Sequence, residues 1–515
     1  MADPSPSTDT QQAVFDLLSD PATYGDSLRN RGIRRYQTHA AVVFLAGDRA
    51  LKIKRAVRYP FLDYSTLDKR KTACEAELEV NRKFAPQLYR RIVPITRESD
   101  GSLALDGRGG PIEWAVEMTR FDENRTLDRL AERDELDDAL IGKLAVAIAA
   151  MHERAEPVEA GPWIVALEQF VRNNTLIFRK HRELFSDRKV SDLERESLSA
   201  LARLRPLLVE RGNQGLVRRG HGDLHLGNIA IVDGEPVAFD ALEFDPVIAS
   251  GDLLYDLAFM LMDLVETGRT RAANQILNGY YAASRRDADY DGIAALPFFM
   301  SLRAAIRAMA TASRLDVTKN DIASLARRYF DLALGLLMPA KPTIVSIGGL
   351  SGTGKSLLAR ALAPSLAPAP GALVFRSDVE RKAFYGRTEN EQLPADAYRP
   401  EISERIYRTV TDKAARVAIA GHSAIVDAVF AKPEERTAIE AAAVAAGVDF
   451  RGLFLVADLK TRLDRIGARE RDASDADTAV VLKQEELAIG AVTWPRIDAS
   501  GSPEQTLAKA CAAMK

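Results

Sequence analysis

The chain has 515 residues and is 47% hydrophobic, which is ample for buried cores and too long for a single one. Its 70 lysines and arginines nearly balance 73 aspartates and glutamates, which argues against a protein that coats nucleic acid. Only two cysteines, Cys74 and Cys511, are present, so a disulfide framework is excluded and a reducing, cytoplasmic location is predicted. No apolar window predicts a transmembrane helix, and the polar, Pro/Ser-rich residues 1–23 predict a flexible tail.

Residues 24–119 mix short β-like runs with one helical pattern. The run AAVVFLAGDRALKIKR predicts two strands joined by a hairpin at Gly47-Asp48. The run DKRKTACEAELEVNRKFA, residues 68–85, is rich in Ala, Glu and Lys and predicts a helix. The run PIEWAVEMTRF, residues 111–121, predicts a further strand.

Residues 120–338 are expected to be mainly helical. Long amphipathic patterns cover residues 136–155 and 298–315. A short β-like insert, GNIAIVDGEPVAFDALEFD, interrupts the helices at residues 227–245.

Two prolines, Pro339 and Pro342, end the last helix and predict a linker over residues 339–342. From residue 343 to residue 515, apolar strands alternate with helices, as in a parallel α/β sheet. The predicted strands are TIVSIGG, ALVFRSD, SAIVDAVF and RGLFLVA.

The run HGDLHLGN, residues 221–228, has the spacing of a phosphoryl-transfer loop. Transfer to a hydroxyl needs a group that orients the nucleophile and accepts its proton, metal ions that bridge the phosphates, and a cation that grips them. We predict Asp223 as that base or orienting carboxylate and Asn228 as a metal ligand. Asp240, at the end of the run PVAFD, is the second predicted ligand, and a carboxylate with an amide oxygen suits Mg²⁺.

The strand LKIKR supplies the cation. Lys52 and Lys54 alternate along it and therefore point to one face. We expect one of them to bind the ATP phosphates, Lys52 before Lys54. A carboxylate from the helix ACEAELEV would hold that lysine, and we favour Glu77 over Glu75 and Glu79.

The run HGDLHLGNIAIVDGEPVAFDALEFD, followed by GDLLYDLAFML, resembles the aminoglycoside phosphotransferase family, a branch of the protein-kinase-like fold. The resemblance implies an α+β bilobal domain, with an N-lobe at 24–119 and a mainly helical C-lobe at 120–338. It also implies that Asp223 is the catalytic aspartate and that Asn228 and Asp240 are the metal ligands.

One feature departs from the family pattern. No G-x-G-x-x-G loop precedes Lys52, so contacts to the phosphates must come from other backbone groups, around Thr38 and His39. We expect His221 and His225 to be structural rather than catalytic.

The run GLSGTGKS fits the phosphate-binding pattern G-x-x-x-x-G-K-[ST] at every position. It follows an apolar strand and opens a helix, whose N-terminus adds partial positive charge. Lys355 would reach the β- and γ-phosphates of ATP, also acting in catalysis, and Ser356 would ligate Mg²⁺. The predicted nucleotide-binding residues are Gly349, Ser351, Gly352, Thr353, Gly354, Lys355 and Ser356.

Two carboxylates end strands of this second region, at the edge where open sheets bind ligands. We expect Asp378 to orient the acceptor hydroxyl and Asp427 to hold the water shell of Mg²⁺. The alternative for each is a helix N-cap.

The run TRLDRIGARERDASDAD carries several arginines beside an acidic turn. A lid that brings arginines to the transferring phosphate has this composition, and so does a salt-bridged surface helix. Arg465 and Arg469 are the predicted catalytic arginines. The runs RSDVERK, VDAVF and RDASDAD resemble the small P-loop kinases grouped with gluconate kinase, chloramphenicol phosphotransferase, polynucleotide kinase and zeta toxin, among predicted AAA-type ATP-binding proteins.

The sequence thus predicts an α+β protein-kinase-like bilobal domain followed by an α/β P-loop NTPase domain with a mostly parallel sheet. The predicted activity is transfer of the γ-phosphate of ATP, with Mg²⁺, to hydroxyls of small polar acceptors. Acidic residues such as Glu243, Asp245 and Asp252 fit either a cationic acceptor or a structural role. Two alternatives remain: a kinase-like domain that only regulates the P-loop domain, and a nucleic-acid end kinase. No membrane partner is expected, and the oligomeric state stays open.

Overall fold

The computed structural model of the protein describes residues 7–25, 32–59, 62–313, 320–388, 391–467, 474–475, 477–487 and 489–514. The chain divides into two compact units. The first comprises Met1–Lys143, Met151–Ala166 and Gly212–Asp256, and the second comprises Leu144–Ala150, Leu167–Arg211 and Leu257–Lys515. The predicted linker at residues 339–342 therefore lies inside the second unit.

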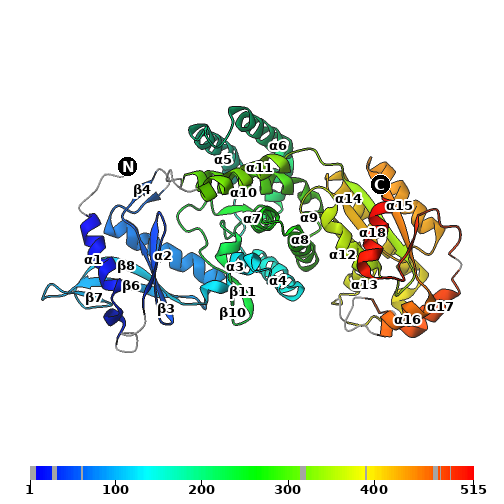
Figure 1. The fold of residues 1–515 in the computed structure, drawn as a ribbon, viewed down its shortest axis with the longest axis horizontal. Helices are drawn as coiled ribbons and strands as arrows, with labels where there is room; N and C mark the ends of the chain where they lie inside the picture. Colours follow the sequence, from blue (N-terminus) through cyan, green and yellow to red (C-terminus); the bar gives the residue numbers. More distant parts are fainter. Residues whose placement is uncertain are drawn as a thin grey trace. The chain divides into compact units, whose positions relative to one another are not determined.

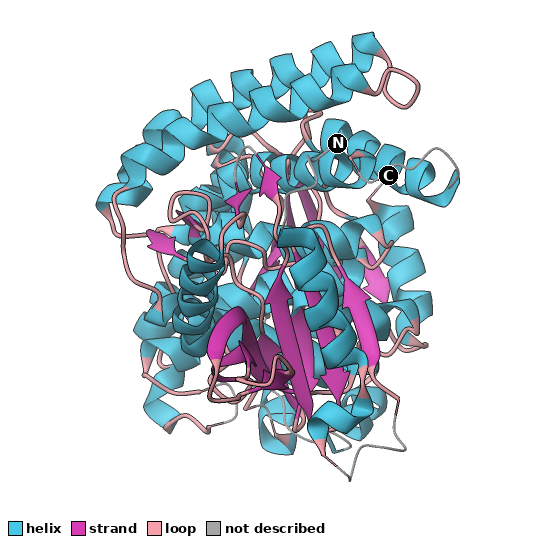
Figure 2. Cartoon of the chain, turned by 90° about the vertical axis from the view of Figure 1, so that its left-hand side faces the viewer, coloured by secondary structure: helices cyan, strands magenta, loops and turns pink. Residues whose placement is uncertain are grey.

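The first unit is built on an antiparallel six-stranded sheet with the strand order β1-β2-β3-β8-β6-β7 (Figure 1). β2 and β3 pair across Gly47-Asp48, which confirms the predicted hairpin. The strands twist relative to one another, as in most sheets (Figure 2). Their bounds are β1 (Arg34–Gln37), β2 (Ala41–Ala46), β3 (Arg49–Lys54), β6 (Tyr89–Arg97), β7 (Leu103–Leu105) and β8 (Gly110–Thr119). A separate hairpin joins β4 (Arg58–Tyr59) to β5 (Leu62–Asp63).

Helix α2 (Leu67–Phe84) confirms the helix predicted in this region. It begins after Thr66, whose hydroxyl accepts a hydrogen bond from the Lys69 N–H and so caps the helix. Its buried Cys74 packs with Val116 of β8. Side chains alternate along β3, so Leu51 and Ile53 enter the core on the other face of the sheet, while the two lysines of β3 turn to α2.

The predicted flexible tail is wrong over residues 7–19, which form helix α1 (Ser7–Ser19). Val14 and Leu18 are fully buried and join the core formed with β2, β3, β6 and β8. The Gln11 amide donates to the Glu113 carboxylate at 2.7 Å. The helix forms because an apolar stripe finds a partner surface, a gain that the Pro/Ser-rich composition of the segment does not reveal.

Helices dominate the middle of the chain, as predicted, and the patterns at 136–155 and 298–315 form α4 and α10. Their bounds are α3 (Leu127–Glu132), α4 (Asp138–Arg154), α5 (Ala160–Lys180), α6 (Asp187–Asn213), α7 (Leu253–Glu266), α8 (Thr270–Ser284), α9 (Asp289–Gly292), α10 (Leu296–Ala312) and α11 (Asn320–Leu336). Among the described residues, the stretch Asp289–Ala312 is long and apolar enough to cross a membrane, which the sequence reading missed. Yet 67% of its most apolar window is buried inside the protein, as in a core helix.

The predicted β-like insert forms the hairpin of β10 (Ile229–Val232) and β11 (Glu235–Ala238). A single 3₁₀ turn, η4 (Leu226–Asn228), leads into β10. A second short pair joins β9 (Val217–Arg219) to β12 (Ser250–Asp252). The run HGDLHLGN therefore lies between β9 and β10, both of which belong to the first unit.

The C-terminal part holds a five-stranded, wholly parallel sheet with the order β14-β15-β13-β16-β17. The chain visits β14 and β15 on one side of β13, then β16 and β17 on the other, so the order reverses beside β13, where open sheets bind ligands. The strand bounds are β13 (Thr343–Gly349), β14 (Leu373–Arg376), β15 (Ala424–Asp427), β16 (Asp449–Val456) and β17 (Arg496–Asp498). This confirms the predicted α/β P-loop fold, while β17 was not predicted.

Helices surround this sheet, and its core includes the fully buried Val345 and Ile347 of β13. Their bounds are α12 (Lys355–Leu362), α13 (Ser377–Phe384), α14 (Pro400–Ile419), α15 (Pro433–Ala445), α16 (Leu459–Gly467), α17 (Thr478–Glu485) and α18 (Pro503–Ala513).

The edge strand β14 is paired on its outer side by side chains of α8. Asn278 accepts from the Val374 N–H at 2.7 Å, and the amides of Asn274 and Asn278 donate to the Ala372 carbonyl at 3.0 and 3.1 Å. These bonds satisfy backbone groups that an edge strand otherwise exposes.

Candidate active sites

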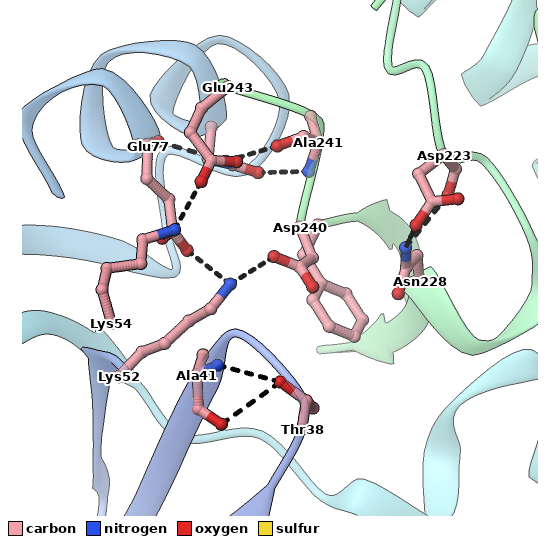
Figure 3. A network of polar contacts seen from close by, with 12 residues as sticks. Thr38, Ala41, Lys52, Lys54, Glu77, Asp223, Asn228, Asp240, Ala241 and Glu243 are labelled. Carbon is pink, nitrogen blue, oxygen red and sulfur yellow. Dashed lines mark hydrogen bonds and ion pairs between the residues drawn. The ribbon is translucent and has the colours of Figure 1, made fainter. Parts of the chain in front are cut away.

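Two lysines of β3 converge on acidic residues in the first unit (Figure 3). The Lys52 ammonium lies 2.8 Å from Glu77 and 2.5 Å from Asp240. The Lys54 ammonium lies 2.6 Å from Glu77 and also contacts Glu243. Glu77 is therefore shared by both lysines, and it is fully buried on α2.

The electrostatics of this cluster favour the charged forms of Lys52 and Asp240. Burial alone would lower the pKa of Lys52, but Asp240 and Glu77 raise it well above its ordinary value. Burial alone would raise the pKa of Asp240, but the Lys52 ammonium holds it below its ordinary value. Three carboxylates, those of Glu77, Asp240 and Glu243, face two ammonium groups, so the cluster carries one excess negative charge.

Glu75 and Glu79, the other two glutamates considered as partners of Lys52, are not part of the buried cluster. Glu75 and Glu79 are exposed, and Glu75 lies 3.7 Å from Lys71 on the same helix.

Asp223 and Asn228 form the second part of the site. The Asn228 amide donates to the Asp223 carboxylate and to the Asp223 carbonyl, both at 3.0 Å. These bonds use the nitrogen of the amide and turn its oxygen to other ligands. The Asp223 side chain is 34% exposed, which leaves it accessible to a substrate. Figure 3 shows this pair beyond Asp240 as seen from the lysines.

Buried groups support the loop at residues 221–228. The Asp256 carboxylate accepts from the N–H groups of His221 and Gly222 at 2.9 and 3.0 Å. His221 donates through Nε2 to the Phe239 carbonyl at 3.0 Å, and burial lowers the pKa of its ring. His225 accepts from the Gly227 N–H through Nδ1. The Nε2 atom of His225 also lies 3.6 Å from the Asp223 carboxylate.

The three acidic residues considered for a cationic acceptor have structural partners. Glu243 binds Lys54 and the Tyr64 hydroxyl. Asp245 accepts from the Val247 N–H at 2.8 Å, and the fully buried Asp252 accepts from the Leu254 N–H at 2.8 Å. The acidic composition of this stretch therefore gives no support for a cationic acceptor.

The turn between β1 and β2 takes the place of a glycine-rich loop. The Thr38 hydroxyl accepts from the Ala41 N–H at 3.0 Å (Figure 3), and the Thr38 N–H donates to the Ala41 carbonyl at 2.8 Å. Thr38 and His39 are exposed, but the Thr38 N–H is already used within the turn.

The phosphate-binding loop joins β13 to α12. Gly352 and Gly354 have φ angles of +85° and +92°, a region that favours glycine. A Cβ on Gly352 would also lie 2.7 Å from the Arg462 carbonyl oxygen. The Lys355 ammonium lies 3.3 Å from the Leu350 carbonyl, and Thr353 donates its hydroxyl proton to the same carbonyl.

The predicted metal and acceptor groups of this region meet at the ends of β14 and β15. The Ser356 hydroxyl donates to Asp427 at 2.5 Å, and the Arg376 guanidinium lies 3.3 Å from the same oxygen. Asp378 sits in the first turn of α13. Burial and the Asp427 carboxylate raise the pKa of Asp378, while Lys355 and Arg376 oppose this shift. Sequence reasoning missed Arg376, although it stands two residues before Asp378.

The arginines of α16 have backbone partners. Arg462 is buried and donates to the Ser351 carbonyl at 2.9 Å, so it supports the phosphate-binding loop. Arg465 lies beside Gly354 and donates to the carbonyls of Ala499 and Gly501 at 2.8 and 3.0 Å. Arg469 lies outside the described residues.

No group of three or more His, Cys, Asp or Glu side chains that could hold a metal ion occurs within the described ranges. A Mg²⁺ ion held mainly by nucleotide phosphates and water needs only one or two protein carboxylates. Ser356 and Asp427, whose side chains are hydrogen-bonded, could offer such oxygen ligands, and so could the side chains of Asp240 and Asn228.

The two regions match two protein-family models. Residues 63–296 match the model of the phosphotransferase enzyme family, and residues 344–488 match the model of an AAA domain. The first match begins after Lys52 and Lys54 and covers Glu77, the loop at residues 221–228 and Asp240. The second covers the phosphate-binding loop, Asp378 and Asp427.

Relatives and solved structures share the same regions. The uncharacterized proteins Rv2004c of Mycobacterium tuberculosis and Mb2027c of Mycobacterium bovis are each 29% identical over 488 residues, which span 92% of this chain and 94% of theirs. A choline/ethanolamine kinase family protein from Mesorhizobium loti aligns with 64% of this chain and 95% of its own, at 14% identity and a TM-score of 0.39. A gluconokinase from Sinorhizobium meliloti aligns with 34% and 93%, at 17% identity and a TM-score of 0.25. Both TM-scores are too low to bear on activity.

The two family matches contain most of the residues of the two candidate sites, apart from Lys52 and Lys54. The protein is thus an ATP-dependent kinase in which a region that matches the phosphotransferase enzyme family model is followed by a region that matches an AAA-domain model.

Proposed function

We propose that the protein transfers the γ-phosphate of ATP, with Mg²⁺, to hydroxyls of small polar acceptors such as sugars, amino sugars or aminoglycoside-like compounds. Each family region would carry an active site of its own, in a kinase-like domain over residues 24–338 and a P-loop kinase domain over residues 343–515. We place the protein in the cytoplasm, which suits its two free cysteines. The observation that carries the proposal is the Lys52 ammonium, shared between Glu77 and Asp240 at 2.8 and 2.5 Å.

In the first site, Asp223 orients the acceptor hydroxyl and takes its proton. The Asn228 oxygen and Asp240 would hold Mg²⁺, which when bound neutralises charge on the phosphates. The Lys52 ammonium would then leave the Asp240 carboxylate and bind a nucleotide phosphate. Its contact with Glu77 would hold it in place during this change of partner. Lys54, bound to Glu77 and Glu243, supports that glutamate.

In the second site, the backbone N–H groups of the phosphate-binding loop and Lys355 bind the ATP phosphates. Ser356 and Asp427 would hold the second Mg²⁺. Asp378 orients the acceptor hydroxyl, and its raised pKa brings it closer to the range in which a carboxylate works as a base. Arg376 would stabilise charge on the transferred phosphate.

A metabolite-pool screen with ATP labelled in the γ-phosphate tests the proposal. Wild-type protein should form phosphorylated products that fall into two groups, one lost in Asp223→Ala and the other in Lys355→Ala. If Asp223→Ala leaves every product unchanged, the kinase-like region is a regulator and the first site is not catalytic. Salt-sensitive phosphorylation of oligonucleotide ends would instead support a nucleic-acid kinase.

A further inference from the structure

Asp240 has a positive φ angle, which is uncommon for residues other than glycine. Its φ angle is +62°, in the left-handed region that disfavours residues with a Cβ. Such a strained conformation persists only when surrounding contacts fix it. The groups that fix it therefore decide where the Asp240 carboxylate points.

Asn81 contacts the residue that follows Asp240. Its side-chain oxygen accepts from the Ala241 N–H at 2.8 Å, and its amide donates to the Ala241 carbonyl at 3.2 Å. Both residues are fully buried. The side chain of Asn81 thus holds both polar groups of the residue that follows Asp240, as a neighbouring strand would.

Two further hydrogen bonds hold the backbone of residues 240–242, and together with those of Asn81 they form what we call the clamp. The Tyr89 hydroxyl accepts from the Asp240 N–H at 3.1 Å. On the other side, the carbonyl of His221 accepts from the Leu242 N–H at 3.0 Å. Asn81 also lies four residues after Glu77, so both project from the same face of α2. One helix face therefore holds the phosphate-binding lysine and the backbone of the predicted metal ligand.

We propose that Asn81 is a positioning residue that fixes Asp240 for metal binding. The inference rests on the proposed function, in which Asp240 is a metal ligand of the first site. Without Asn81, two buried backbone groups of Ala241 lose their partner, and the segment can relax out of the left-handed conformation. Metal affinity then falls, because a ligand is no longer held in place.

The test measures Mn²⁺ binding in place of Mg²⁺, by electron paramagnetic resonance of free Mn²⁺ in the presence of ADP. The full chain carries Lys355→Ala and Ser356→Ala, which disable the second site. Asn81→Leu removes both bonds at similar size, and Asn81→Asp keeps only the acceptor. Asp240→Asn marks the loss of the ligand itself. Asn274→Leu is the matched control, because Asn274 of α8 is also buried and its amide also donates to a backbone carbonyl.

We expect Asn81→Leu to raise the Mn²⁺ dissociation constant by about tenfold to a hundredfold, with a smaller rise in Asn81→Asp and none in Asn274→Leu. Unchanged binding in Asn81→Leu, alongside lost binding in Asp240→Asn, would overturn the role of Asn81 alone. Unchanged binding in Asp240→Asn would overturn the metal assignment and this inference with it. If Asn81→Leu does not fold, Asn81→Asp and Tyr89→Phe carry the same test, since each removes one bond of the clamp.

Discussion

Replacing Glu77 with glutamine removes the charge that both lysines of the first site share while keeping the shape of the side chain. At 2.8 Å, a unit charge pair with an effective dielectric of about 20 interacts by about 6 kcal/mol, and desolvation offsets much of that gain. Losing one partner of a buried pair costs about 3–5 kcal/mol. Lys52 and Lys54 each keep another carboxylate, so we expect about 2–3 kcal/mol of lost stability.

We expect Glu77→Gln to lower the activity of the folded protein as well as its stability. Without Glu77, the Lys52 ammonium is held by Asp240, the carboxylate that the metal needs. We expect kcat/KM of the first site to fall about a hundredfold, equivalent to about 2.7 kcal/mol.

The assay measures initial rates and thermal unfolding in the Lys355→Ala background, where only the first site contributes. Glu75→Gln is the matched control, because Glu75 lies on the same helix and its side chain is 53% exposed. Equal rates in Glu77→Gln and Glu75→Gln would refute the reasoning.

Three further predictions concern other parts of the chain. Burial and Asp427 raise the pKa of Asp378 above its ordinary value of 3.8. On acidification the Asp378 carboxylate should therefore become protonated, and the P-loop reaction should slow, at a pH that is still higher than 3.8. A full rate at pH 3.8 in the Asp223→Ala protein would contradict this. Ser356→Ala removes the hydroxyl that contacts Asp427, and we expect the Mg²⁺ concentration for half-maximal P-loop rate to rise about tenfold, with the first-site product unaffected. Leu18→Ala should lower the free energy of unfolding in denaturant by about 2–5 kcal/mol, whereas a flexible tail would give almost no change.

The sequence predicted those parts of the fold whose signals are local. The hairpin at Gly47-Asp48 and the strands of the parallel sheet follow from turn chemistry and apolar runs. Helix α1 was missed because its few apolar residues matter only once the sheet is present to bury them. Strand β17 has three residues, and its pairing with β16 alone makes it a strand.

The difference between local signals and contacts that form only in the fold also explains which site residues could be predicted. The phosphate-binding loop could be read directly, because its glycines and lysine act through one short stretch of backbone. Asn81 could not, because its partner Ala241 is 160 residues away and nothing in the sequence around it marks an amide as necessary. Glu77 was singled out among three glutamates, and the fold separates them by burying only that one.

The most direct test of two catalytic sites is the rate at which the Lys355→Ala protein forms phosphorylated product from labelled ATP, with and without the added Asp223→Ala substitution. We predict that Lys355→Ala alone retains one class of product and that the second substitution abolishes it. Loss of all product in Lys355→Ala alone, with wild-type product formation in Asp223→Ala alone, would contradict catalysis at the kinase-like site.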